Sequence, residues 1–319
     1  MEFKRRAVYV RARVHRRRRV RRRRRLLLLG ILVLVAAAAT LAAAELAGEN
    51  GTERTMPERM LSGLTLPDTG AELEYGRSGM GRPLNAYRFG SGENTLLLTF
   101  AIHGYEDSFA ADGAVLVYTA YQLMAALDQS AALLEASDWT VYVLPCLNPD
   151  GLYDGHTNDG PGRCTVVSLD ASGAGVDMNR CFPAGWKAMT GARNFNGGAP
   201  LACVEAVALA RFAEEVQGTG RSVCIDAHGW YQQTITSDGA DGSLFALFHS
   251  RFPDNTWADC RNGEGYFTAY TAELGYDSCL FEFPGDVYSF EGFLEKGYAE
   301  RFTACVLELL AGGAQGEER

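Results

Sequence analysis

Short apolar runs and longer segments of helical periodicity alternate from about residue 69 to residue 310. Strands are predicted where apolar residues cluster, at residues 84–89, 95–102, 139–146, 222–226 and 278–283. Helices are predicted where apolar residues recur at helical spacing, at residues 111–127, 203–216 and 293–310. The run at 95–102 is almost uninterrupted, which is typical of a strand covered on both faces. This alternation predicts a layered α/β fold.

The N-terminal segment has a different pattern. Residues 26–44 are 19 consecutive positions without a charge, about the length of a helix that crosses a hydrocarbon core of roughly 30 Å. Residues 1–25 are rich in arginine, and cationic residues beside an apolar span stay in the cytoplasm. We therefore expect one N-terminal transmembrane helix, with residues 45–319 outside the cytoplasm. Three alanines before Glu45 also resemble a signal-peptide cleavage site, so a cleaved, secreted form is the alternative.

The charge of the chain divides sharply between its two parts. Residues 1–25 contain 14 Lys and Arg against one Glu, which leaves 16 basic and 38 acidic residues for the rest. An acidic body repels a polyanion, so we expect no nucleic-acid partner. The arginine run alone is also typical of a nucleic-acid arm or nuclear signal. The apolar segment that follows it leaves no basic domain to share such binding, so the membrane is the expected partner of this end.

Composition divides the remainder of the chain into a stalk, one domain and a tail. Residues 45–68 are polar and without sustained periodicity, residues 69–312 form one folded domain, and residues 313–319 are a short tail. The domain contains all eight cysteines: Cys146, Cys164, Cys181, Cys203, Cys224, Cys260, Cys279 and Cys305. Outside the cytoplasm disulfides can persist, but no CxxC occurs and the connectivity stays open.

A candidate metal site is formed by two of the five histidines and one glutamate. His103 and Glu106 stand in the segment HGYE, directly after a predicted strand, and His228 follows another predicted strand in DAHG. Ligands at strand ends are held by the sheet and face an open cleft. Two His and one Glu leave a fourth coordination position for water, the pattern of catalytic zinc. HxxE alone is a weak signal, and a capping or surface role is the alternative.

Six motifs in order carry a resemblance to a known family. They are GRSGMGRPLNAYRFG (76–90), HGYE (103–106), LNPDG (147–151), GVDMNRCFP (175–183), DAHG (226–229) and LFEFPGD (280–286). Together they resemble the zinc carboxypeptidases of the carboxypeptidase A type, the M14 peptidases, over residues 70–310. The resemblance implies a three-layer α/β/α sandwich on a mixed β-sheet. The interval between His228 and Glu282 is shorter than in the digestive enzymes, as in bacterial relatives that cut peptidoglycan stem peptides.

The resemblance also implies roles for the residues of the metal site. His103, Glu106 and His228 match the ligands of one Zn²⁺, and Glu282 matches the general base. Zinc lowers the pKa of bound water, and a nearby carboxylate takes its proton and passes it to the leaving amine. The alternative for Glu282 is a surface position on an edge strand, which its apolar neighbours disfavour.

Residues for substrate binding follow from the same resemblance. Asn179 and Arg180 match the pair that binds the substrate's terminal carboxylate, for which Arg offers two parallel hydrogen bonds. Arg163 stands near the position of an Arg that stabilises the oxyanion. Tyr266 and Tyr270 both fall closer to the base than the family's active-site Tyr does, and we prefer Tyr266.

Several positions depart from the pattern or have two interpretations. Cys181 replaces an expected polar residue, which indicates a disulfide or an altered wall of the site. Asp226 either orients a ligand or is a solvated strand end. The side-chain pocket is expected near Thr268. His156 and His249 have no matching partners and are interpreted as surface residues.

The sequence as a whole predicts a membrane-tethered zinc metallocarboxypeptidase that faces away from the cytoplasm. It would hydrolyse the last peptide bond of peptides or of peptidoglycan stem peptides. No pro-segment of the digestive type fits before residue 69, so synthesis in an active form is expected. Two other hypotheses stay open, namely a zinc deacylase of the aspartoacylase sort and a non-catalytic surface-binding module that keeps the fold.

Overall fold

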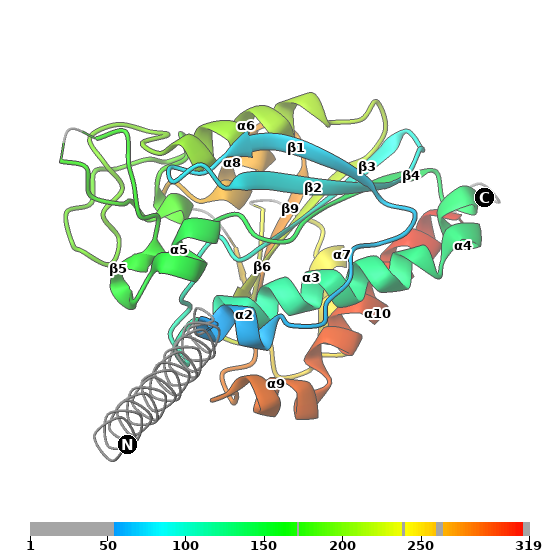
Figure 1. Ribbon diagram of the computed structural model, residues 1–319. Helices are drawn as coiled ribbons and strands as arrows, with labels where there is room; N and C mark the ends of the chain where they lie inside the picture. Colours follow the sequence, from blue (N-terminus) through cyan, green and yellow to red (C-terminus); the bar gives the residue numbers. More distant parts are fainter. Residues whose placement is uncertain (1–53, 171, 238–239, 260–263, 315–319) are drawn as a thin grey trace, which may run out of the picture. The chain divides into compact units, whose positions relative to one another are not determined.

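A mixed sheet of eight strands forms the centre of the protein (Figure 1). The computed structural model describes residues 54–170, 172–237, 240–259 and 264–314. In spatial order the strands are β1 (Ala71–Arg77), β2 (Pro83–Gly90), β4 (Trp139–Leu144), β3 (Asn94–Phe100), β6 (Ser222–Gly229), β9 (Asp277–Phe283), β7 (Gln233–Thr236) and β8 (Thr256–Asp259). The four central strands β4, β3, β6 and β9 are parallel, whereas β2 and β7 flank them in antiparallel pairing. The predicted mixed sheet is confirmed.

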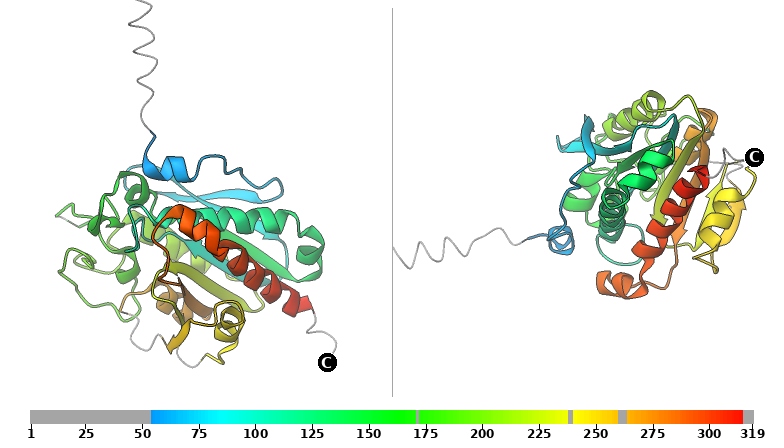
Figure 2. Two further views of the ribbon diagram at one scale, coloured as in Figure 1. Left: turned by 90° about the horizontal axis from the view of Figure 1, so that it is seen from below. Right: turned by 90° about the vertical axis from the view of Figure 1, so that its right-hand side faces the viewer.

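Helices cover both faces of this sheet, so the predicted three layers are present (Figures 1 and 2). One face carries α3 (Gly113–Asp128), α7 (Ser243–His249) and α10 (Tyr298–Ala314), and the other carries α6 (Val204–Glu215) and α8 (Phe267–Glu273). The remaining elements are α2 (Met56–Met60), α4 (Ala131–Ala136), α5 (Pro149–Asp154), β5 (Thr157–Cys164), the 3₁₀ helix η1 (Met178–Arg180) and α9 (Phe290–Lys296).

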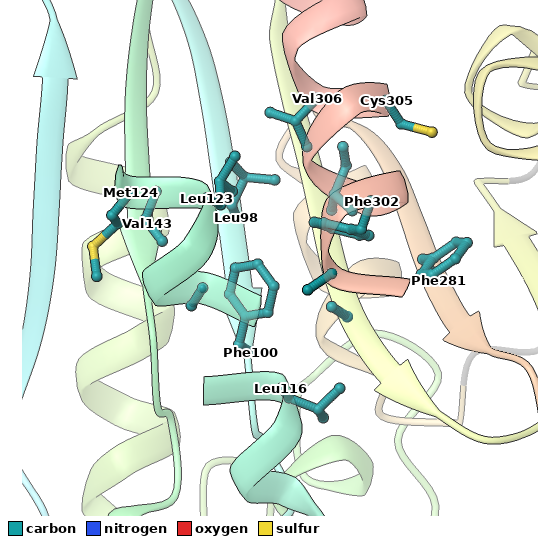
Figure 3. Close-up of a cluster of buried hydrophobic side chains, with 14 of the residues drawn as sticks. Leu98, Phe100, Leu116, Leu123, Met124, Val143, Phe281, Phe302, Cys305 and Val306 are labelled. Atoms are coloured by element: carbon teal, nitrogen blue, oxygen red, sulfur yellow. The ribbon is translucent and has the colours of Figure 1, made fainter. Parts of the chain in front are cut away.

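Alternate side chains of the central strands divide the core into two clusters. On β3, Leu98 and Phe100 belong to the cluster under α3 and α10, whereas Leu97 belongs to the cluster under α6. Figure 3 shows Leu98 and Phe100 beside Leu123 of α3 and Phe302 of α10. Each such fully buried side chain contributes roughly 1.5–3 kcal/mol relative to an exposed one. The uninterrupted apolar run of β3 is therefore explained by burial on both faces.

Several predicted boundaries differ from the structure. β6 runs to Gly229, beyond the predicted end at residue 226, so His228 lies within this strand and not after it. The helix predicted at 293–310 is two helices, α9 and α10, because Gly297 takes a left-handed conformation with φ 63° that ends α9. Within the predicted stalk, α2 is capped by reciprocal hydrogen bonds between Thr55 and Glu58. Met60 of this helix packs against the core cluster under α3, so packing begins ahead of Thr69.

The predicted membrane span at 26–44 lies outside the described residues. Among the helices that the structure describes, none combines the length and the apolar character needed to cross a bilayer. Seven cysteines are described, and all seven are free thiols, six of them buried. Cys181, where a disulfide was one interpretation, is among the buried thiols; Cys260 lies outside the described residues.

Candidate active site

The predicted zinc ligands meet at one edge of the sheet, where its parallel strands end. His103 and Glu106 stand in the loop that leaves β3, and His228 is the penultimate residue of β6. Because β3 and β6 are parallel neighbours, their carboxyl ends present these side chains to the same crevice. Glu282 lies on β9, directly opposite His228 in the register of the next parallel pair. Adjacent strand ends therefore position all four groups.

The geometry of the three ligands fits a cation. Glu106 lies between the histidines, with Oε2 3.2 Å from Nδ1 of His103 and Oε1 3.3 Å from Nδ1 of His228. One ligand atom from each residue lies within 4.8 Å of the others, and all three side chains are buried. Oε1 of Glu106 has no hydrogen-bond partner, which a bound cation would supply. Two imidazoles and one carboxylate are the donor set of catalytic zinc.

Two buried aspartates hold the outer nitrogens of these histidines. Nε2 of His103 lies 3.0 Å from Asp177, and Nε2 of His228 lies 2.9 Å from Asp226. Such contacts place the proton on Nε2 and leave Nδ1 free to bind metal. Asp226 also accepts a hydrogen bond from Thr99 and is fully buried, so the alternative of a solvated strand end is wrong. Asp177 was missed, although it stands in the motif GVDMNR.

The charges in the site shift the pKa values of its carboxyl groups. Burial alone would raise the pKa of Glu106, but the two neighbouring histidines lower it to about 2. Burial raises the pKa of Glu282 to about 7, although His228 partly opposes this shift. A carboxyl group with a pKa near neutrality is suited to both accept and return a proton.

The residues preferred as zinc ligands, catalytic groups and substrate-binding groups line one cavity of about 340 Å³. The lining residues include the zinc ligands His103, Glu106 and His228, together with Glu282, Arg163, Asn179, Arg180 and Tyr266. Residues separated by up to 179 positions along the chain thus share one space, as expected of a catalytic cleft.

The polar residues beside the zinc ligands are held in place by specific contacts. Arg163 is buried, and its Nε donates to Asp177 over 3.3 Å. Asn179 accepts a hydrogen bond from the backbone N–H of Phe267, and its amide nitrogen lies 3.5 Å from Nε2 of His228. Arg163 is therefore linked to His103 through Asp177, and Asn179 lies beside His228.

The two candidate tyrosines have different environments. The guanidinium of Arg180 lies 4.3 Å from the centre of the Tyr266 ring, and both residues line the cavity. Tyr270 instead donates to Glu214 and stacks on Phe182 inside the core. This placement favours Tyr266 and removes Tyr270 from the site.

Thr268, near which the side-chain pocket was expected, is not itself part of the cavity lining. It is buried on α8. The apolar part of the lining comes instead from Ile235 of β7 and Leu280 of β9, beside Gln233. Ile235 was not predicted, because the pairing of β7 with β9 depends on tertiary contacts that have no local motif.

The other two histidines that the structure describes do not line the cavity. His156 and His249 are exposed, and His249 stacks on Phe245, as predicted for surface residues. His15 lies outside the described residues.

Comparisons with known proteins agree with this fold and metal centre. The family model of zinc carboxypeptidase, Peptidase M14, matches residues 65–257. A bacteriocin of Clostridium perfringens, BCN5, is 32% identical over 243 residues, which are 76% of this chain and 26% of that protein. The chain thus spans about a quarter of the length of this relative.

Solved structures share the fold at low sequence identity. Bovine thrombin-activatable fibrinolysis inhibitor matches with a TM-score of 0.62 and 16% identity, over 82% of this chain and 95% of that one. The carboxypeptidase A of Helicoverpa armigera has a TM-score of 0.60, 16% identity, and coverage of 82% and 72%. The murein-tripeptide amidase MpaA of Escherichia coli O157 has a TM-score of 0.51, 22% identity, and coverage of 82% and 98%.

The fold and the His, Glu, His site define a zinc-dependent hydrolase. The chain belongs to the M14 family of zinc carboxypeptidases, and it is a zinc metallocarboxypeptidase with one metal site at His103, Glu106 and His228. The family match ends at residue 257. Glu282 is therefore placed at the site by its register opposite His228 and by the cavity that it lines.

Proposed function

We propose that this enzyme removes C-terminal residues from peptidoglycan stem peptides on the outer side of the cytoplasmic membrane. One observation carries the peptidase part of the proposal. Glu282, beside the zinc ligands, and Arg180, which can bind a terminal carboxylate, line the same cavity. A substrate held by Arg180 places its last amide bond within reach of the metal end of the cavity.

Each of these cavity residues has a role in the proposed mechanism. His103, Glu106 and His228 would hold the zinc ion, which when bound would lower the pKa of a water molecule and polarise the scissile carbonyl. The carboxylate of Glu282 accepts a proton from that water and delivers it to the leaving nitrogen. Arg163 donates to the carbonyl oxygen as negative charge develops there. Arg180 binds the terminal carboxylate, and the Tyr266 ring packs against its guanidinium.

The substrate class is supported by size and by two similar proteins. MpaA is named a murein-tripeptide amidase, and this chain covers 98% of its length. BCN5 is named a bacteriocin and shares 32% of its residues with this chain over the matched region. Peptidoglycan lies outside the cytoplasm. The acidic body, the apolar segment 26–44 and the arginine-rich residues 1–25 favour attachment to the membrane with the catalytic domain outside.

The proposal is tested by product analysis with the zinc-loaded full chain. A panel contains muropeptides, ordinary peptides, and each of these with an amidated C-terminus. We expect release of the last residue from free-acid muropeptides, and at least tenfold slower cleavage of the amidated forms because Arg180 loses its anionic partner. Equal cleavage of ordinary peptides would remove the peptidoglycan assignment. Cleavage of acyl-amino acids but of no peptide would instead select a deacylase.

A further inference from the structure

A buried hydrogen bond outside the cavity joins the start of α3, next to the loop that carries Glu106, to the segment that follows His228. We propose that Asp112 and Trp230 are positioning residues of the metal centre, and that their mutual bond fixes Glu106 relative to His228. Neither residue lines the cavity. The inference concerns the zinc site and holds whichever amide bond the enzyme cleaves.

Asp112 holds the loop that carries Glu106 through several backbone groups. Its Oδ1 accepts the N–H of Glu106 at 2.5 Å, and its Oδ2 accepts those of Ser108 at 2.7 Å and Phe109 at 3.4 Å. Asp112 is fully buried. Charge-assisted bonds from backbone N–H groups to a buried carboxylate are short and strong. The backbone of the zinc ligand is thus bound directly.

The position of Asp112 in the fold makes these contacts unusual. It is the N-cap of α3, where an Asp normally accepts a hydrogen bond from the first turn of its own helix. Its side chain makes no such capping bond. Both oxygens are used instead for the loop and for Trp230, so the usual contribution of the residue to the helix is replaced by contacts with the metal loop.

The start of α3 is built against this loop. A Cβ added to Gly113 would lie 2.6 Å from the carbonyl oxygen of His103, so only glycine permits the approach. The N–H of Gly113 donates to the carbonyl of Gly104 over 3.2 Å. The first turn of a core helix therefore supports both ligands that follow β3.

Trp230 extends the same support to the second ligand segment. It stands two residues after His228, and its indole N–H donates to Oδ2 of Asp112 over 2.8 Å. The ring also packs near Phe283, which follows Glu282, and near Phe293, with centroid distances of 6.4 and 6.0 Å. Trp230, in the segment of His228, thus contacts Asp112, which binds the backbone of Glu106, and it packs near β9, the strand of the proposed base.

The chain offers a matched control for this bond. Trp139, at the start of β4, is buried in the same core cluster, and its indole nitrogen has no hydrogen-bond partner. Trp230→Phe and Trp139→Phe therefore remove the same atoms, but only the first breaks a hydrogen bond. A general effect of shrinking a buried indole would appear in both variants.

The decisive measurement is the zinc dissociation constant of the full chain, obtained by competition with a chromophoric chelator. Outer contacts of metal ligands commonly contribute about 10- to 100-fold to affinity, so we expect Trp230→Phe to weaken zinc binding at least about tenfold. Trp139→Phe should stay within about twofold of the parent. For the zinc-loaded Trp230→Phe enzyme, kcat should fall more than KM rises, since the residue does not touch the substrate. Equal zinc affinity in the two variants would overturn the proposal.

A second variant guards against loss of folding and tests the bond itself. Asp112→Asn keeps the shape of the side chain but turns an acceptor into a donor, and it should weaken zinc binding more than Trp230→Phe does. In the double variant the two effects should overlap, so that the loss resembles that of Asp112→Asn alone. Multiplication of the two single losses would show that the residues act independently, and would contradict the proposed link.

Discussion

The zinc side and the substrate side of the cavity are built in different ways. The metal ligands and Glu282 stand on, or directly after, three adjacent parallel strands. Asn179 and Arg180 belong to residues 165–203, where η1 is the only regular element that the structure describes. Side-chain and backbone hydrogen bonds hold that segment, such as the 2.6 Å bond from Asp177 N–H to the carbonyl of Phe195. Metal binding and substrate binding should therefore respond separately to mutation.

The largest effect is expected on the strand side, from loss of a ligand. His228→Ala should lose zinc and reduce kcat/KM by at least about 10⁴-fold, because the metal supplies several kcal/mol of transition-state stabilisation. A chelator should reduce the parent enzyme to the same level, and added zinc should restore only the parent. His249→Ala is the matched control, since that histidine is exposed, and it should retain full zinc and activity. Retained zinc stoichiometry in His228→Ala would refute the ligand assignment.

The next largest effect distinguishes the role of the general base from that of the metal. Glu282→Gln should lower kcat by about 10²–10⁴-fold, the usual contribution of a general acid or base. The amide keeps the size of the side chain but cannot accept the proton. Zinc content measured by elemental analysis should stay at one ion per chain. Activity equal to that of the parent would remove Glu282 from the mechanism.

A third prediction moves to the substrate side. Arg180→Met removes a charge-assisted bond of about 1.5–3 kcal/mol, so kcat/KM for free-acid substrates should fall about 10- to 150-fold. Zinc affinity should not change, because Arg180 makes no contact with the ligands. Discrimination against amidated substrates should disappear in the variant. If the variant still preferred the free acid, another residue would have to bind the terminal carboxylate.

The sequence predicted the residues of the metal site but not the contacts that support them. His103, Glu106 and Glu282 were predictable because each stands at the end of an apolar run and within a short motif. The hydrogen bonds that hold these residues in place were not predictable. The importance of Asp112 depends on a side chain 118 positions away, and that contact leaves no periodicity in the sequence.

The side-chain pocket shows the same limit. Ile235 reaches the cavity only because β7 pairs antiparallel with β9, in a register that sets Ile235 opposite Leu280. The expectation at Thr268 came from position along the chain, whereas the observed lining comes from strand pairing. Local pattern thus identified the strands, and tertiary packing decided which of their residues face the substrate.

The smallest of the expected effects tests how the substrate segment keeps its shape. Asn196 is fully buried, and its side chain accepts from Met189 N–H and donates to the carbonyls of Arg180 and Lys187, each over 2.8 Å. Asn196→Ala leaves these three backbone groups without a partner. Holding Arg180 in its binding position should then cost about 1–2 kcal/mol more free energy. KM should rise about 5- to 30-fold, with zinc affinity unchanged.

Asn85→Ala serves as the control for this substitution. Its amide donates to Glu72 across the pair of β1 and β2, and neither of these two residues lines the cavity. KM should therefore stay at the parent value. A loss of zinc in Asn196→Ala would contradict the separation of the two sides, because it would show that the irregular segment also shapes the ligands. The route for such coupling would be Asp177, which belongs to this segment and contacts His103.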